Sequence, residues 1–287
     1  MTKRLVALFL LVMVCLWTSG VAGATEQVAY DGPAWTFDVP LSALNDALLV
    51  LASPLSPLES TAEPLNLVSV QSRRNGENGE NLNGGLRKAS NTSMKLDADA
   101  YAALVMLFNG AEDAGVELYL RQGYRSYEDQ AARYETAVSR GETEGVPQAG
   151  QTDYQTGLAA MVVGKDWRVK TLTAPEFAQT PEYQWLAANC ARYGYVIRYP
   201  EFKEDITGAE FEPWHLRYVG TDIANYMSSH DLCLEEFCQE KDAAQEEFIS
   251  RGGDVNAAIS AEELPDGPVI LLEEGPDGDR EITIFHD

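Results

Sequence analysis

The sequence predicts an α+β fold: a small antiparallel sheet flanked by helices, with a short β-hairpin near the C-terminus. The first observation behind this prediction is that helical and strand-like patterns follow one another without the β–α–β rhythm of a parallel sheet. The second is composition, because 45% hydrophobic and 23% charged residues are typical of a folded globular chain. The third is length, since 287 residues can bury a sizeable core in one large domain or two small ones.

The first 24 residues have the features of a signal peptide. Lys3 and Arg4 give a positive start, an unbroken apolar run follows from Leu5 to Trp17, and residues 22–24 (Ala-Gly-Ala) supply the small residues that signal peptidase recognises. The apolar run, about 13 residues long, is too short to span a membrane comfortably. We therefore expect cleavage after this tripeptide and a secreted protein, extracellular or associated with the cell wall, with no membrane segment beyond the signal peptide.

The rest of the chain is expected to contain an N-terminal segment and linker (25–65), a core domain (66–240) and an acidic C-terminal extension with a hairpin (241–287). In the N-terminal segment, Leu41–Leu51 predicts one short helix. Asn75–Gly85 (NGENGENLNGG) predicts a flexible loop, because asparagine and glycine favour turns over regular structure.

The core domain begins with a well-marked helix and strand. Leu96–Gly115 places apolar residues at helical spacing, Asp97 and Asp99 favour the start of the helix, and Gly115 ends it. Val116–Arg121 (VELYLR) alternates apolar and polar residues, which predicts a half-buried strand. We expect further helices at Tyr127–Arg140, Pro181–Tyr193, Asp222–Met227 and Leu234–Phe248, a strand at Tyr195–Tyr199, and hairpin strands at Val269–Leu272 and Glu281–Phe285.

Charge and cysteine content exclude several classes of protein. With 45 acidic against 21 basic residues the formal charge is −24, which argues against binding to nucleic acid or to anionic lipid. Three cysteines remain after the leader: Cys190, Cys233 and Cys238. They form no CxxC pair, which excludes a zinc knuckle. One disulfide with one free thiol is compatible with export, and the pairing stays open.

Three motifs occur in a fixed order along the core domain. They are Gln122–Tyr127 (QGYRSY) with Gln130 shortly after it, Gln151–Met161 (QTDYQTGLAAM), and Phe211–Gly220 (FEPWHLRYVG). This series resembles the SGYRSxxxQ, SEHQTGLAVD and YEPWHLRYVG segments of the VanY-type D-alanyl-D-alanine carboxypeptidases. The resemblance covers roughly residues 66–240, and the succession of motifs is far more specific than any one of them.

The resemblance implies the fold of the D-Ala-D-Ala metallopeptidases. It also implies hydrolysis of the D-Ala-D-Ala end of peptidoglycan stem peptides by one zinc ion, whose three protein ligands leave a fourth position for water. Carried over residue by residue, His215 is a zinc ligand and Glu212 the general base. Arg125, Gln130 and Thr152 are then expected to bind the substrate.

Two of the three expected zinc ligands are missing. Tyr154 stands where the family has histidine, and Met161 stands where it has aspartate. A phenol with an ordinary pKa near 10 is a poor zinc ligand, and a neutral thioether is a worse one. Of the other histidines, neither His230 nor His286 is placed as an obvious substitute. We therefore expect zinc to be lost or weakly held.

Three functions remain open on this basis. The first is a secreted pseudoenzyme that still recognises stem peptides, since Arg125, Thr152 and Glu212 remain. The second is an active carboxypeptidase with an atypical metal site, formed by His215, Tyr154 and an acidic residue such as Asp153. The third is a non-catalytic scaffold or interaction protein at the cell wall, in which the acidic surface or the C-terminal hairpin is the functional part.

Overall fold

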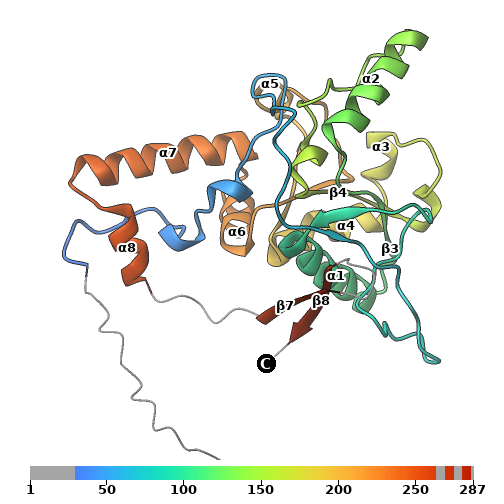
Figure 1. The fold of residues 1–287 in the computed structure, drawn as a ribbon, viewed down its shortest axis with the longest axis horizontal. Helices are drawn as coiled ribbons and strands as arrows, with labels where there is room; N and C mark the ends of the chain where they lie inside the picture. The colour runs from blue at the N-terminus through green and yellow to red at the C-terminus, as the bar shows by residue number, and fades with distance from the viewer. Residues whose placement is uncertain (1–29, 263–268, 275–279, 286–287) are drawn as a thin grey trace, which may run out of the picture.

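The computed structural model describes residues 30–262, 269–274 and 280–285, with the side chains described for the first of these ranges. The expected signal peptide therefore lies outside the described residues. The described chain has the expected α+β fold, in which a four-stranded antiparallel sheet is packed between helices and accompanied by two smaller two-stranded sheets (Figure 1).

The four-stranded sheet has the order β3-β4-β6-β5, and every neighbouring pair is antiparallel. Its strands are β3 (Leu118–Gln122), β4 (Ala159–Gly164), β6 (His215–Tyr218) and β5 (Tyr195–Ile197). The expected strands at Val116–Arg121 and Tyr195–Tyr199 correspond to the two outer strands. The two central strands bring the second and third motifs together, because Met161 on β4 lies directly opposite His215 on β6.

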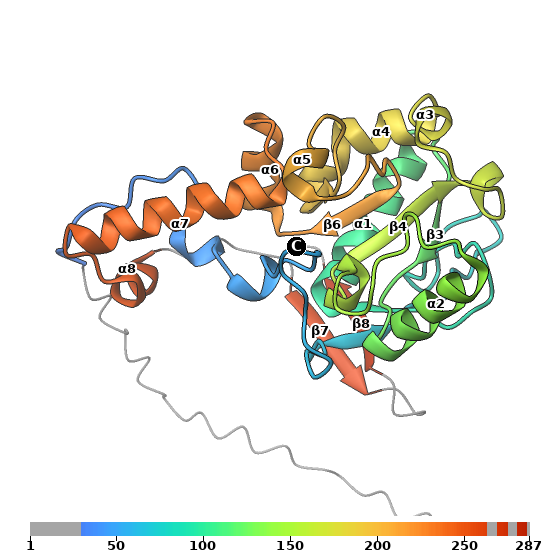
Figure 2. The same cartoon turned by 90° about the horizontal axis from the view of Figure 1, so that it is seen from above.

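Helix α1 (Ala98–Asp113) covers one face of this sheet, as Figure 2 shows. Leu104 and Leu107 on the helix belong to the same buried cluster as Leu120, Val162 and Leu216 on the strands. The helix begins at Ala98 rather than at the predicted Leu96, because the Asp97 carboxylate caps it by accepting hydrogen bonds from the first backbone N–H groups. Burial of this apolar face is the main force that holds the helix on the sheet.

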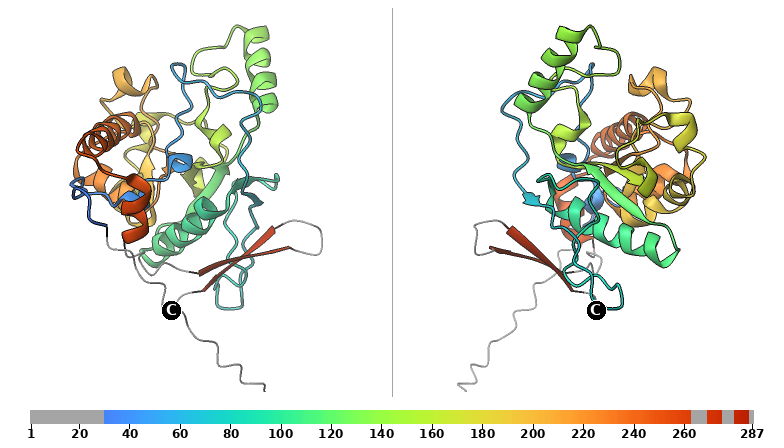
Figure 3. Two further views of the ribbon diagram at one scale, coloured as in Figure 1. Left: turned by 60° about the vertical axis from the view of Figure 1, so that its left-hand side comes forward. Right: turned by 90° about the vertical axis from the view of Figure 1, so that its right-hand side faces the viewer.

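Helix α2 (Tyr127–Arg140) has the predicted bounds and projects from the body of the domain (Figure 3). Ser126 caps its first turn by accepting a hydrogen bond from the backbone N–H of Asp129. Gly141 ends it with a φ of 71°, a left-handed conformation that glycine adopts without steric cost. One short element, η3 (Asp153–Thr156), lies within the second motif. The short elements between the second and third motifs are η4 (Lys165–Trp167), α3 (Ala174–Phe177), α4 (Pro181–Asn189), η5 (Cys190–Tyr193) and α5 (Glu204–Thr207).

The single helix expected at Leu41–Leu51 is wrong. The segment instead forms two single 3-10 turns, η1 (Leu41–Ala43) and η2 (Asp46–Leu48). Asn45 separates them because it is extended and its side chain accepts a hydrogen bond from the backbone N–H of Ala47. An asparagine that caps a new turn in this way interrupts a continuous helix.

The N-terminal segment packs against the helices that follow the last motif: α6 (Thr221–Ser229), α7 (Leu234–Ser250) and α8 (Val255–Ala261). Val39 and Leu49 share a buried cluster with Phe237 of α7. Backbone N–H groups of Leu41 and Ser42 donate to the Glu262 carboxylate at the end of α8. The start and end of the described 30–262 range therefore fold together as one layer beside the sheet (Figure 1).

The expected C-terminal hairpin is present as β7 (Val269–Glu274) paired antiparallel with β8 (Arg280–Phe285). It lies at the opposite end of the molecule from α2 (Figure 3). The second small sheet pairs β1 (Leu67–Ser69) with β2 (Lys95–Asp97). Across the described ranges, no helix is long and apolar enough to cross a membrane. The cysteines expected to remain after the leader are all described, and each is unpaired.

Candidate functional site

The three motifs converge at one edge of β4 and β6. The Tyr154 ring stacks on the His215 imidazole with 4.5 Å between centroids and an angle of 19° between planes. The Arg125 guanidinium carbon lies 5.2 Å from the centroid of the Tyr154 ring. Met161 and His215 face each other across the two strands, and directly opposed side chains lie on the same face of a sheet. The candidate site therefore has Tyr154 at its centre, between the arginine and the histidine.

A tight turn brings Tyr154 and Met161 to the same histidine. Tyr154 lies in η3, which ends at Gly157 with a φ of 74°. This left-handed conformation favours glycine and lets the chain turn sharply from η3 into β4, which carries Met161.

Glu212 and His215 form a short pair. The Glu212 carboxylate lies 2.6 Å from Nδ1 of His215, and the backbone N–H of His215 donates to the Glu212 carbonyl. The histidine side chain is buried at 3% exposure, whereas the glutamate side chain is 36% exposed. The carboxylate that the resemblance assigns as general base is therefore bound to the one retained zinc-ligand histidine and still reaches solvent.

The pKa of His215 is raised above its ordinary value. Burial by itself lowers this pKa, but the Asp153 and Glu212 carboxylates outweigh burial because both favour the imidazolium. Because the pKa is higher in the folded state, protonation of His215 stabilises the fold. This stabilisation is complete at pH values below the unfolded-state histidine pKa of about 6.5. This contribution is lost as the pH rises through the folded-state pKa.

Replacing Glu212 by glutamine is expected to lower the pKa of His215, because a neutral amide no longer favours the imidazolium. The free energy of unfolding should fall by about 1 kcal/mol near pH 5.5 and change little in alkaline solution. Urea unfolding at several pH values and NMR titration of the imidazole measure both effects. Glu210→Gln, at an exposed position two residues earlier, is the matched control. An unchanged pKa for His215 in the Glu212 variant contradicts the assignment.

Asp153, the acidic residue considered for an atypical metal site, is committed to a buried ionic cluster. Its Oδ1 accepts a hydrogen bond from Arg217 and lies 3.7 Å from Nε of Arg198, and all three side chains have 0% exposure. Its Oδ2 lies 3.4 Å from Nε2 of His215. Burial alone would raise the pKa of Asp153, but Arg217, His215 and Arg198 outweigh burial and hold this pKa well below its usual range.

Both arginines of this cluster have further partners. Arg198 binds both oxygens of Glu235, at 2.7 and 3.0 Å. Arg217 donates to the backbone carbonyls of Leu48 and Val50 in the N-terminal segment. The negative charge of Asp153 is thus neutralised inside the fold. Its carboxylate therefore has a structural role next to the site and is not free to bind a ligand.

The side chains around His215 do not fit a zinc ion of the kind the resemblance implies. Within the residues that the structure describes, no three His, Cys, Asp or Glu side chains are grouped to hold a metal. Burial raises the pKa of the Tyr154 phenol well above its ordinary value, and Glu212 raises it further, so the phenolate that could bind a cation is disfavoured. Met161 offers only a neutral thioether, which is not a typical zinc donor.

Arg125 is oriented by two glutamine oxygens. Its Nη1 donates to Oε1 of Gln130 at 2.7 Å, and its Nη2 donates to Oε1 of Gln122 at 3.0 Å. Gln130 is fully buried and its amide N–H donates to the Pro147 carbonyl, so it lies behind the arginine and holds it. Thr152, at 4% exposure, precedes η3. The roles of Gln130 and Thr152 in substrate binding stay predictions.

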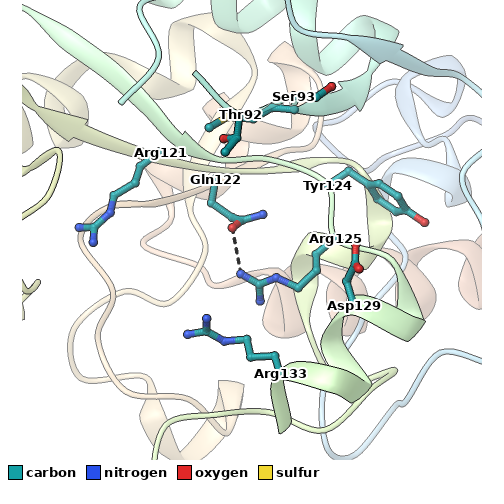
Figure 4. A pocket seen from close by; sticks show the side chains of 9 residues that line it. Thr92, Ser93, Arg121, Gln122, Tyr124, Arg125, Asp129 and Arg133 are labelled. Carbon is teal, nitrogen blue, oxygen red and sulfur yellow. Dashed lines mark hydrogen bonds between the residues drawn. The ribbon is translucent and has the colours of Figure 1, made fainter. Parts of the chain in front are cut away.

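The structure adds residues that the motifs alone did not indicate. Gln122, which replaces the serine before GYRS, is one of the two residues that orient Arg125. A polar pocket of about 370 Å³ opens beside Arg125 and is also lined by Arg121 and Arg133 (Figure 4). A signal was available in the sequence, because Asp129 and Arg133 are four residues apart and share one face of the predicted helix.

Comparison with known proteins places these observations in a family. The family description "VanY: D-alanyl-D-alanine carboxypeptidase" matches residues 93–221. A putative carboxypeptidase of Bacillus subtilis (strain 168), YodJ, is 40% identical over 146 residues, which are 50% of this chain and 53% of that protein. A D-alanyl-D-alanine carboxypeptidase of Enterococcus faecium is 35% identical over 132 residues, 46% of this chain and 40% of that protein. The chain thus spans about half the length of these curated relatives.

A solved structure extends the likeness to the fold. The LdcB LD-carboxypeptidase, whose structure was described as revealing the molecular basis of peptidoglycan recognition, is 33% identical with a TM-score of 0.56. The match covers 67% of this chain and 86% of LdcB. Fold and motifs together define a peptidase-like α+β domain of the carboxypeptidase class. The chain belongs to the VanY D-alanyl-D-alanine carboxypeptidase family.

Proposed function

We propose that this chain is a pseudoenzyme of the VanY family, which binds peptidoglycan stem peptides ending in D-Ala-D-Ala and does not hydrolyse them. The observation that carries the proposal is the stacking of Tyr154 on His215, 4.5 Å between ring centroids, at a position where the family has a zinc ligand. With Met161 at the other position, the proposed loss of zinc rests on the chemistry of the donor side chains. Without a bound zinc, no metal activates the attacking water.

The means to bind a peptide end are retained. The planar guanidinium of Arg125 is held by Gln122 and Gln130 and stacks near the Tyr154 ring, so it is preorganised for a carboxylate. Arg125 forms no ion pair with a carboxylate in the described part of the chain, which leaves its charge available to a ligand. The partly exposed Glu212 carboxylate lies beside His215, one of the stacked rings. It is therefore placed to accept hydrogen bonds from amide N–H groups of the same ligand.

We also propose export and action at the cell wall. The leader-like segment at residues 1–24 supports export. The peptidoglycan recognition described for LdcB supports the wall as the place where the ligand is met. The C-terminal hairpin and acidic extension have no part in this proposal.

Replacing Arg125 by alanine is expected to weaken binding of a D-Ala-D-Ala pentapeptide by about tenfold or more, because the charged partner of its terminal carboxylate is removed. Isothermal titration calorimetry with residues 25–287 measures this effect. Arg140→Ala removes the same charge from an exposed position on α2 and serves as the matched control. Absence of saturable binding by the natural sequence at millimolar peptide contradicts the proposal and favours the scaffold alternative.

A further inference from the structure

The pocket beside Arg125 is lined by an unusual set of charges. Arg121 is at the end of β3, Arg125 follows it, and Asp129 and Arg133 come from the first turns of α2. In Figure 4 the guanidinium groups of Arg125 and Arg133 are directed to the same side, and the guanidinium of Arg121 lies apart from them. The chain as a whole is strongly acidic, with 45 acidic and 21 basic residues. The pocket is the opposite, because three arginines and a single carboxylate line it.

The three arginines have few partners that would explain this arrangement. None of them forms an ion pair with a carboxylate among the residues described, although other arginines of the chain do. Arg121 donates from one nitrogen to the carbonyls of Trp167 and Lys170, and Arg125 is held by its two glutamines. The Arg133 side chain is exposed and makes no hydrogen bond or ion pair with any described residue.

The like charges also influence one another. Burial lowers the pKa of Arg125 and the neighbouring Arg133 charge also lowers it, whereas Tyr154, Asp129 and Glu212 oppose this shift in part. Neighbouring guanidinium groups such as those of Arg125 and Arg133 repel each other, and an anion bound beside them relieves this repulsion. Three arginines against one aspartate give the lining a formal charge of plus two, so the ligand that neutralises it carries two negative charges.

We infer that this pocket binds a doubly charged oxyanion. The guanidinium of Arg125 is fixed by Gln122 and Gln130 and presents a preorganised donor fork, while Arg133 adds a second fork from α2 and Arg121 a third charge from β3. The chemistry fits a phosphate group or two closely spaced carboxylates. Arg121 and Arg133 lie outside the three motifs, so this is a property of the chain's own residues.

The inference shares Arg125 with the proposed function but does not depend on it. A small oxyanion contains no D-alanine, so its binding reports on the pocket alone. Failure of the pentapeptide to bind would leave the oxyanion result standing, and failure of the oxyanion to bind would leave peptide binding standing.

The test is calorimetric titration of residues 25–287 with inorganic phosphate at low salt and about pH 8, where phosphate is mainly doubly charged. Acetate is the singly charged comparison. We expect saturable phosphate binding that Arg133→Gln weakens by about tenfold, and acetate binding at least tenfold weaker than phosphate binding. Asp129→Asn should tighten phosphate binding about threefold, because it removes the only carboxylate of the lining.

Arg140→Gln removes an exposed arginine from the same helix and should leave phosphate binding unchanged. Succinate separates the two sources of the charge: stronger binding of succinate than of phosphate identifies paired carboxylates, and the reverse identifies a phosphate group. The inference is overturned if neither dianion binds saturably, if acetate binds as well as both, or if Arg133→Gln and Arg140→Gln have equal effects.

Discussion

Replacing Asp153 by asparagine is expected to lower the free energy of unfolding by about 3 to 5 kcal/mol. The side chains of Asp153, Arg198 and Arg217 have 0% exposure, and Asp153 is the carboxylate that lies between the two guanidinium groups. Asparagine keeps nearly the same shape, so packing is retained and the negative charge alone is lost. Arg217 is then left buried with neutral acceptors alone, the amide oxygen of the new side chain and backbone carbonyls, and Arg198 keeps Glu235 as its carboxylate partner.

Urea unfolding followed by circular dichroism measures this change. Glu247→Gln is the matched control, because Glu247 and Arg251 form an exposed pair at 3.8 Å whose loss should cost less than about 1 kcal/mol. A loss below that value for Asp153→Asn would show that the buried cluster contributes no more than a surface pair. In that case the cluster of Asp153, Arg198 and Arg217 would not be what holds the residues next to His215 in place.

The pH dependence provides a second check of the same prediction. The pKa of Asp153 is depressed in the folded state, mainly because Arg217 overcomes the opposing effect of burial. A depressed pKa stabilises the fold above the unfolded value of about 3.9, and this contribution is lost as the pH falls through the folded-state pKa. The natural protein and the variant should therefore still differ at about pH 4 and converge only in stronger acid. The difference should be larger in mild acid than in alkaline solution, because Asp153 also favours the imidazolium of His215.

Helix positions were the part of the fold most accessible from sequence. Helix α2 has the predicted bounds because local residues determine both ends: Ser126 caps the start and Gly141 adopts the left-handed end. Helix α1 begins directly after Asp97, one of the two aspartates that favour a helix start in the sequence. Local hydrogen-bonding chemistry can be recognised without knowledge of the tertiary structure.

The central strands were not predicted, because their neighbours determine them. Strand β4 (AAMVVG) is an apolar run without the alternation of a half-buried strand, since it is covered on both faces. Strand β6 is only four residues long and directly follows Pro213 and Trp214. By contrast, the division of Leu41–Leu51 into two turns was missed although its cause, the Asn45 cap on the second turn, is local.

The site was predictable as a set of residues and not as a set of interactions. The motifs grouped Arg125, Glu212 and His215 correctly in space. They could not show that Asp153 is bound by two arginines, because that depends on strands β5 and β6 lying side by side. The oxyanion pocket was missed for the same reason, since it forms only where the end of β3 meets α2.

Restoring histidine at 154 and aspartate at 161 is expected to create a zinc site and D-alanine release. Tyr154 stacks directly on His215, and Met161 lies opposite His215 across β4 and β6, so all three positions are adjacent. Two imidazoles and one carboxylate are a donor set typical of catalytic zinc. The double variant Tyr154→His with Met161→Asp should bind zinc at least about a hundredfold more tightly than the natural chain.

The two single variants are the controls that make this prediction specific. Each supplies only two of the three donors, so neither should approach the zinc affinity of the double variant. Competition with a chromogenic chelator measures zinc binding, and release of D-alanine from a D-Ala-D-Ala pentapeptide measures hydrolysis. Activity in the double variant alone means that the scaffold, with Glu212 beside His215, is intact and that the side chains at 154 and 161 are what separate this chain from hydrolysis. Chelator-sensitive release by the natural chain contradicts the proposed loss of zinc, because Tyr154 and Met161 would then be compatible with a working metal site.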